Sequence, residues 1–194
     1  DWSNSLDYIK ADPSIQEVIL SGGDPLAISD RQLLWLIQKL ESISHLKILR
    51  IHSRVPIVLP QRTTPELVAI LNESRFEVVI VVHCNHSQEI SDNVKTAIEA
   101  LRLSKITLLN QSVILAGIND EPGILKELSH TLFSLSILPY YLHLPDKVIG
   151  TSHFSVTSDK AIRVINSLRK ELPGYLVPIL VQEEPGASSK TRLV

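Results

Sequence analysis

Val18-Ile19-Leu20-Ser21-Gly22-Gly23-Asp24-Pro25-Leu26 is the stretch of sequence that decides the fold class. Its apolar residues indicate a buried strand, which breaks off into two glycines and a carboxylate. Because glycine has no Cβ, a ligand can approach the main chain closely at such a point. The stretch therefore predicts a strand of an α/β fold whose carboxyl end faces a ligand. Strands often end in two glycines, so the prediction gains its weight from later strands that also carry polar residues at or near their ends.

Apolar runs typical of buried strands alternate along the chain with segments of helical spacing. The expected strands are residues 17–20, 48–51, 78–82, 107–115, 139–143 and 177–181. Apolar residues repeat every three to four positions in the segments 33–43, 67–71, 90–101, 124–132 and 162–172. Capping signals at Thr64-Pro65-Glu66 and Ser158-Asp159 indicate two helix starts.

This alternation of strands and helices predicts parallel βα units with right-handed crossovers. Six such units favour a barrel or a partial barrel, although a doubly wound open sheet has the same periodicity. In both architectures ligands gather at the carboxyl ends of the strands. We expect one domain over residues 1–194, because that length suits a single core and the sequence has no internal linker or repeat.

The composition excludes several classes of protein. The chain has 194 residues, 44% of them hydrophobic, and a formal net charge of −2, so it offers no electrostatic footprint for nucleic acid or an anionic membrane. No apolar stretch approaches the ~20 residues that span a bilayer, and no secretory signal opens the chain. Its single cysteine, Cys84, excludes an internal disulfide and cannot by itself hold an iron–sulfur cluster. We expect a cytoplasmic protein.

Two of the later strand ends carry histidines among other polar residues. His52-Ser53-Arg54 suits a carboxylate or a phosphate, although Arg54 could equally pair with a structural acid. His83-Cys84-Asn85-His86 contains a pair of histidines with metal-ligand spacing. Residues three apart on a strand face opposite sides, however, so hydrogen-bonded histidines are the simpler interpretation.

The remaining strand ends contribute an amide, a carboxylate and a lysine. Gln111 lies in an apolar run, where a buried amide needs a partner, either a ligand or the backbone. Asp146 follows the strand 139–143 and could bind an ammonium group or pair with the adjacent Lys147. The segment 183–194 presents Lys190 on a loop of small residues, as a lysine that reaches a carbonyl group requires. Composition alone favours a solvated lysine at that position.

Taken together, these runs resemble the lysine 2,3-aminomutase family of radical S-adenosylmethionine enzymes. The matching stretches are Val-Ile-Leu-Ser-Gly-Gly-Asp-Pro-Leu (18–26), Leu-Arg-Ile-His-Ser-Arg-Val-Pro-Ile-Val (49–58), Leu-Leu-Asn-Gln-Ser-Val-Ile-Leu (108–115), Pro-Tyr-Tyr-Leu-His (139–143) and Gly-Thr-Ser-His-Phe (150–154). The forms His-Ser-Arg at 52–54, Asp-Lys-Val at 146–148 and Gly-Tyr-Leu-Val-Pro at 174–178 are most similar to the branch that makes β-lysine for elongation factor P. The resemblance covers essentially the whole chain.

The resemblance implies an α/β fold, a partial (β/α) barrel of the radical S-adenosylmethionine type, and a role for each matching residue. Lys190, the catalytic residue of this chain, would hold pyridoxal phosphate covalently, within a cofactor loop at residues 183–194, and Gln111 would contact the phosphate. Asp146 and Glu183 would hold the ε-ammonium group of substrate lysine. The positions that would contact S-adenosylmethionine are Ser21, Gly22, Gly23, Asp24, Ser53, Arg54 and His83.

The implied reaction is a radical 1,2-amino shift that converts L-α-lysine to β-lysine. Its partners would be L-lysine and, functionally, elongation factor P and its lysyl-ligase; a homo-oligomer is also compatible with the resemblance. The family's third cofactor, a [4Fe–4S] cluster, is held by Cys-x-x-x-Cys-x-x-Cys, and this sequence has no such motif. We therefore expect no metal ligands in this chain, which resembles a C-terminal portion without the first βα unit, and no activity from it alone.

Two other functions remain open at the level of sequence. His83, His86, His143 and Asp146 could serve a metal-dependent hydrolase or aldolase built on a barrel. Alternatively, the chain could be a non-catalytic module that binds pyridoxal phosphate or S-adenosylmethionine.

Overall fold

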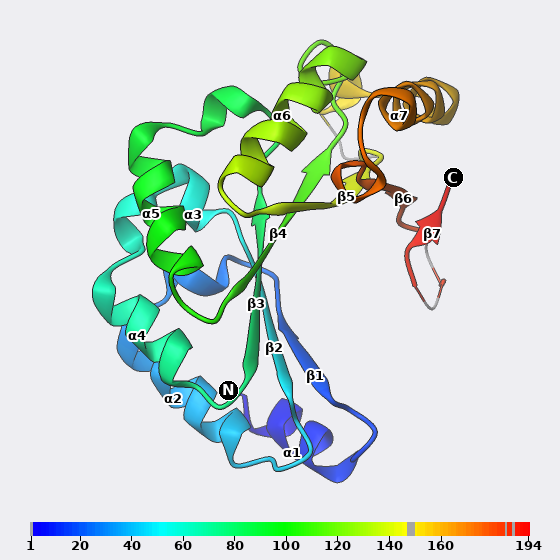
Figure 1. The fold of residues 1–194 in the computed structure, drawn as a ribbon. Helices are drawn as coiled ribbons and strands as arrows, with labels where there is room; N and C mark the ends of the chain where they lie inside the picture. The colour runs from blue at the N-terminus through cyan, green and yellow to red at the C-terminus, as the bar shows by residue number, and fades with distance from the viewer. Residues whose placement is uncertain (1, 147–149, 185, 188) are drawn as a thin grey trace. The chain divides into compact units, whose positions relative to one another are not determined.

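The computed structural model describes residues 2–146, 150–184, 186–187 and 189–194. They form two compact units, in which residues up to Val82 group with Asp92–Leu108, and His83–Ser91 with Leu109–Val194 (Figure 1). Lys147 and Val148, which are part of the resemblance given above, lie outside the described residues. The expectation of a single domain stays a prediction.

The first unit contains three parallel strands in chain order, β1 (Glu17–Leu20), β2 (Ile48–Ser53) and β3 (Glu77–His83, up to Val82). Figure 1 shows the helices of this unit beside the strands. They are α1 (Ser3–Ala11), α2 (Asp30–Glu41), the short α3 (Val55–Val58), α4 (Pro65–Glu73) and α5 (Asp92–Arg102).

Helix α2 shows how the sequence determines the local structure of this unit. It begins with a capping box, in which the Ser29 hydroxyl accepts from the backbone of Gln32 and the Gln32 side chain accepts in return from Ser29. Its apolar stripe, Leu33, Leu36, Ile37 and Leu40, is buried. Each such side chain contributes about 2 kcal/mol through removal from water, so the stripe attaches the helix to the core.

The second unit contains β4 (Thr107–Val113, from Leu109 on), β5 (Leu138–His143) and β6 (Ile179–Gln182), which are parallel. A two-residue strand, β7 (Thr191–Arg192), pairs antiparallel with β6. Helices α6 (Pro122–Ser134) and α7 (Ser158–Glu171) belong to the same unit (Figure 1). The described strands follow one another in chain order and alternate with helices, which confirms the predicted α/β fold of the partial (β/α) barrel type.

The structure differs from the sequence predictions mainly at element ends. Strand β4 stops at Val113, because the amide of Leu115 donates to the side chain of Asn119 at 2.7 Å and the chain turns. Strand β6 starts at Ile179, since Gly174–Leu176 forms a 3₁₀ turn and Pro178 has no N–H to donate. Thr64 caps α4 as predicted, whereas α7 is capped by Thr157, one residue before the predicted signal.

Strand β7 has no counterpart among the predicted elements. No helix within the described residues combines the length and apolar character needed to cross a membrane.

Candidate functional site

The glycine loop, which we define as Ser21–Asp24, follows strand β1 in the first unit. Gly22 and Gly23 have φ angles of +82° and +57°, the left-handed region that other residues rarely adopt. A Cβ added at either position would meet nothing within 4 Å. The backbone conformation therefore requires glycine here, and the loop presents its main chain to open space.

Asp24 links the glycine loop to the end of strand β2. Its Oδ1 accepts from the Ser53 hydroxyl at 2.6 Å and from the Leu26 amide at 3.1 Å. Its Oδ2 accepts from the amides of Arg54 at 2.7 Å and Val55 at 3.3 Å. Four donors from two chain segments therefore surround one carboxylate.

This arrangement distinguishes among the residues predicted to line the S-adenosylmethionine site. Ser53 is fully buried, and its hydroxyl donates to Asp24. Ser21, Gly22 and Gly23 are exposed, as is Arg54. The carboxylate and the hydroxyl therefore hold the loop in its conformation, whereas the loop main chain and the Arg54 side chain are exposed.

In the second unit, the antiparallel pairing of β6 and β7 brings Lys190 back to Glu183. Glu183 follows the last residue of β6, and Lys190 precedes the first residue of β7. The Lys190 Nζ donates a hydrogen bond to Glu183 Oε1, and this bond lowers the pKa of Glu183. The Nζ also lies 5.9 Å from the centroid of the Tyr141 ring. Lys190 is half-buried, so its amine is neither fully solvated nor enclosed.

His143, the last residue of β5, lies in the same region of the second unit. Only 8% of its surface is exposed, and its ring meets that of Tyr141 edge-on at 5.8 Å. Burial lowers the pKa of His143 to about 4, and the positive charge of Lys190 adds to the effect, against the opposing charges of Glu183 and Asp146. The imidazole is therefore neutral near pH 7.

Gln111 reaches this region through an irregularity in the β4–β5 pairing. Asn110 pairs with Pro139 and Gln111 with Tyr141, so the register shifts by one residue between them. Such a bulge re-aims the side chains beside it. The Gln111 Oε1 is buried and has no hydrogen-bond partner among the described residues, and the same holds for the Nε2 of His143. We name the group Gln111, Tyr141, His143, Asp146, Glu183 and Lys190 the Lys190 cluster.

Two further predicted residues, Asp146 and His83, also belong to the second unit. Asp146 is exposed, and its charge raises the pKa of His143, while the charge of His83 lowers it. The Nδ1 of His86 accepts from the amide of Gln88 and caps a short turn. Within the described parts of the chain, no three His, Cys, Asp or Glu side chains are arranged to hold a metal ion.

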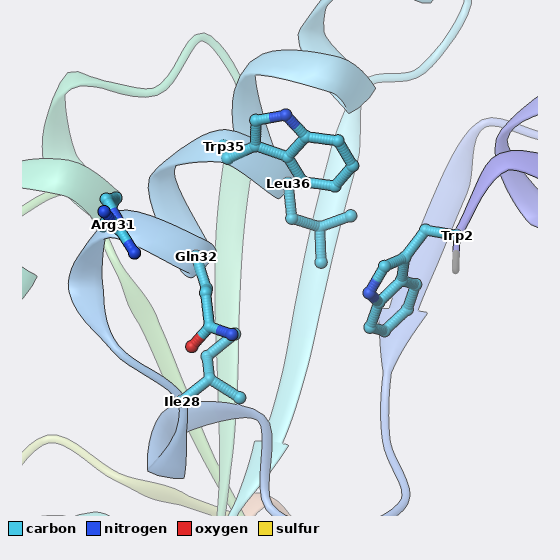
Figure 2. Close-up of a pocket in the computed structure, with 6 residues that line it drawn as sticks. All are labelled: Trp2, Ile28, Arg31, Gln32, Trp35 and Leu36. Atoms are coloured by element: carbon cyan, nitrogen blue, oxygen red, sulfur yellow. The ribbon is translucent and has the colours of Figure 1, made fainter.

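The first unit also has a pocket that sequence analysis did not find. Figure 2 shows the side chains that line its volume of about 390 Å³: Trp2, Ile28, Arg31, Gln32, Trp35 and Leu36. Trp2 precedes α1, and most of the others come from α2. It contains none of the residues predicted to bind a cofactor or substrate.

His143 and Tyr141 are the members of the Lys190 cluster that sequence analysis did not assign to the aminomutase site. A signal for them was available, since residues two apart on a strand face the same side. Tyr141 pairs with Gln111, and His143 with Val113. Once Gln111 is taken as a ligand contact, this register places Tyr141 beside it on the neighbouring strand. His143 then lies two residues further along that strand, on the same side.

Comparison with known proteins finds several relatives that share one name. No family model matches the chain. It is 50% identical to the L-lysine 2,3-aminomutase of Haemophilus influenzae over 98% of its length, and 45% identical to that of Escherichia coli over 100%. The chain covers 56% of each of these two proteins. It is also 42% identical to the L-lysine 2,3-aminomutase of Clostridium subterminale, over 96% of the chain and 45% of that protein.

Among solved structures, a domain of pyruvate-formate lyase-activating enzyme from Bacteroides vulgatus has a similar fold. The TM-score is 0.57 at 12% sequence identity, and the match covers 86% of this chain and 98% of that one. The chain spans about half the length of the curated relatives it matches. Over nearly its whole length, it is a homologue of proteins named L-lysine 2,3-aminomutase.

Proposed function

We propose that the protein functions as part of a lysine 2,3-aminomutase. This enzyme is an isomerase that moves the amino group of L-lysine from C2 to C3 and forms β-lysine. The observation that carries this proposal is the Lys190 cluster. There, in a homologue of proteins of that name, a lysine amine, a carboxylate and two buried polar atoms without partners among the described residues occur in one unit. These are the groups that a cofactor aldehyde, a substrate ammonium and polar ligand atoms require.

Pyridoxal phosphate fits the chemistry of this cluster. The Lys190 amine would hold it, and the Gln111 amide would contact its phosphate with the N–H end, because the two ends of an amide exchange by rotation. When bound, pyridoxal phosphate supplies an aldehyde for amines and a ring that delocalises an unpaired electron. The chain's own part is to bind and orient it, with residues 183–194 as the lysine-bearing loop.

Glu183 and Asp146 would bind the ε-ammonium group of the substrate. Glu183 already accepts a hydrogen bond from one primary ammonium group, that of Lys190. With the Lys190 amine holding the cofactor, the Glu183 carboxylate would be available for the ammonium group of the substrate. Charge-assisted hydrogen bonds of this kind are stronger than neutral ones, and they fix the far end of the substrate.

The glycine loop fits the amino-acid end of S-adenosylmethionine. Ser21, Gly22 and Gly23 are exposed, and nothing lies within 4 Å of a Cβ added at either glycine, so carbonyl and amide groups there can meet the ligand's ammonium and carboxylate. Arg54, in the same unit, would line the same nucleotide's site, and the role of His83, which belongs to the second unit, stays a prediction. Because the Asp24 carboxylate already has four donors, we assign Asp24 and Ser53 the task of holding the loop in shape.

A [4Fe–4S] cluster does not fit this chain. The sequence has one cysteine, Cys84, which is buried and donates through Sγ to the carbonyl of His86 at 3.3 Å. We derive no step through the cluster, and we expect the 194-residue polypeptide by itself to be inactive.

The finer proposal concerns the use of the product. The segments 52–54 and 174–178 resemble the branch that supplies β-lysine for elongation factor P, so we propose a cytoplasmic role in that modification. Incubating the product with elongation factor P and its lysyl-ligase tests this directly. Attachment of β-lysine, seen as a mass increase on elongation factor P, is expected; product that the ligase does not use would contradict the role.

Reductive trapping tests the cofactor assignment. The protein is loaded with pyridoxal phosphate, reduced with borohydride and digested, and its peptides are mapped by mass spectrometry. We expect the label on the Lys190 peptide and none on that of Lys160, whose amine pairs with Asp120 at 2.5 Å in the same unit. Lys190→Arg keeps the positive charge beside Glu183 and should lose the label. An unlabelled Lys190 in the wild-type protein would refute the proposal.

A further inference from the structure

His143 is a buried polar side chain to which the proposed function gives no role. Only 8% of its surface is exposed, so more than nine-tenths is buried, and its Nε2 has no hydrogen-bond partner among the described residues. Leaving a buried polar atom unpaired costs about 1–3 kcal/mol. Such an atom within a cluster of ligand-binding residues points to a partner that arrives with the ligand.

The charges around His143 indicate the chemistry of that partner. Lys190, Glu183, Asp146 and His83 all act electrostatically on the ring, and burial together with Lys190 keeps it neutral. A neutral imidazole carries one proton, so one of its nitrogens is an acceptor. With the proton on Nδ1, the buried Nε2 can receive a hydrogen bond from a cationic donor.

An ammonium group has three N–H donors, and Asp146 and Glu183 are both carboxylates that would accept from it. The ion pair between Lys190 and Glu183 shows that a primary ammonium group fits beside Glu183, and its charge reaches the imidazole. We propose that Nε2 of His143 is the third acceptor for the ε-ammonium group of the substrate, and so a specificity-determining contact. The inference rests on the proposed function and deepens it.

Binding of two amino acids tests the inference without any measurement of activity. L-Lysine and L-norleucine share their backbone and carbon chain, but norleucine lacks the ε-amino group. Their dissociation constants are measured by calorimetry on the protein loaded with pyridoxal phosphate, for wild type and for His143→Gln, His143→Asn and His143→Phe. The glutamine amide extends to about the position of Nε2, whereas the asparagine amide is too short and phenylalanine has no acceptor.

We expect wild type to prefer lysine strongly and His143→Gln to keep most of the preference. His143→Asn and His143→Phe should weaken lysine binding about ten- to hundredfold, because an ammonium donor would be buried unpaired, while norleucine binding changes little. Thermal unfolding checks that each variant is folded. If His143→Phe does not fold, the comparison of glutamine with asparagine carries the test.

The outcomes separate the two proposals. If wild type binds lysine and norleucine equally, or if Lys190 is not trapped by borohydride, the proposed function fails and the role of His143 fails with it. If wild type prefers lysine and the folded asparagine and phenylalanine variants keep that preference, the role of His143 alone is overturned.

Discussion

The glycine loop and the Lys190 cluster use their polar groups in opposite ways. In the glycine loop, the Asp24 carboxylate has four donors, one of them the buried Ser53 hydroxyl. In the Lys190 cluster, Gln111 and His143 each bury an atom that has no partner within the described residues. Buried polar groups that make all their hydrogen bonds stabilise the structure, while buried groups without a hydrogen-bond partner lower stability until a ligand pairs with them. Substitutions in the two regions should therefore separate stability from binding.

The largest effect on stability is expected at His143 and depends on pH. The pKa of its imidazole is about 4 in the folded protein and 6.5 as the ordinary value. Above pH 6.5 the ring is neutral in both states and contributes nothing to the pH dependence. As the pH falls from 6.5 to 4, the unfolded chain takes up a proton that the folded one does not. The free energy of unfolding should drop by about 3 kcal/mol over that window.

Urea unfolding of wild type and His143→Gln across pH 4–8 measures this contribution. Subtracting the two curves removes what the other histidines contribute to both proteins. The difference should change across the window and level off above pH 6.5. A difference that does not vary with pH would show that the ring is accessible to protons, and hence not buried as the structure has it.

The second effect concerns Asp24. Replacing Asp24 with alanine leaves the buried Ser53 hydroxyl and the amide of Arg54 without their acceptor, so the free energy of unfolding should fall by about 2 kcal/mol. Asp24→Asn should lie between wild type and alanine, because its Oδ1 still accepts while its N–H₂ faces other donors. Asp12→Ala is the matched control, since that exposed carboxylate accepts only locally, from Ser14. Equal losses at Asp24 and Asp12 would contradict a structural role for Asp24.

The third effect is a change in stability that has opposite signs when alanine replaces two different glycines. Gly22→Ala forces a Cβ into a backbone with φ of +82°, which should destabilise the protein by about 1 kcal/mol although the added atom meets no neighbour within 4 Å. Gly123 lies in helix α6 without a positive φ, and Gly123→Ala should stabilise by up to about 1 kcal/mol. Chemical denaturation of both variants checks the signs. A Gly22→Ala variant that is as stable as wild type, or more stable, would mean that the loop does not hold Gly22 in its left-handed conformation.

The sequence predicted the elements better than the contacts between them. Apolar runs such as residues 78–82 identify strands because burial of such a run requires no knowledge of the partner strand. Strand β7 was not predicted, since two residues carry no period, and it exists only by pairing with β6. Likewise, the link between Asp24 and Ser53 joins residues 29 apart, so no local pattern could indicate it.

In the candidate site, too, the contacts between elements could not be predicted from local sequence patterns. Gln111, Glu183 and Lys190 were assigned to the site through a resemblance, and the assignment stays a prediction. The antiparallel pairing of β7 with β6 explains how Lys190 comes to contact Glu183. The burial of His143 depends on packing within the second unit. In the sequence, it is one histidine at the end of a strand, and the only role considered for it there was in a metal-dependent hydrolase or aldolase.

The smallest effect on stability, at Glu183, is also the sharpest test of the contrast between the two regions. Lys190 and Glu183 are partly exposed, and ion pairs of that kind contribute little, so Glu183→Gln should reduce the free energy of unfolding by roughly half a kcal/mol or less. The same variant removes a negative charge that we assign to the substrate ammonium, so lysine binding should weaken at least tenfold while norleucine binding stays unchanged. Calorimetric titration and urea unfolding of one preparation measure both quantities. Glu184→Gln is the adjacent control, because Glu184 accepts from Thr191 at 3.0 Å and has no assigned ligand role. If Glu183→Gln instead destabilises the fold and leaves lysine binding intact, Glu183 is a structural partner of Lys190, and the Lys190 cluster resembles the glycine loop after all.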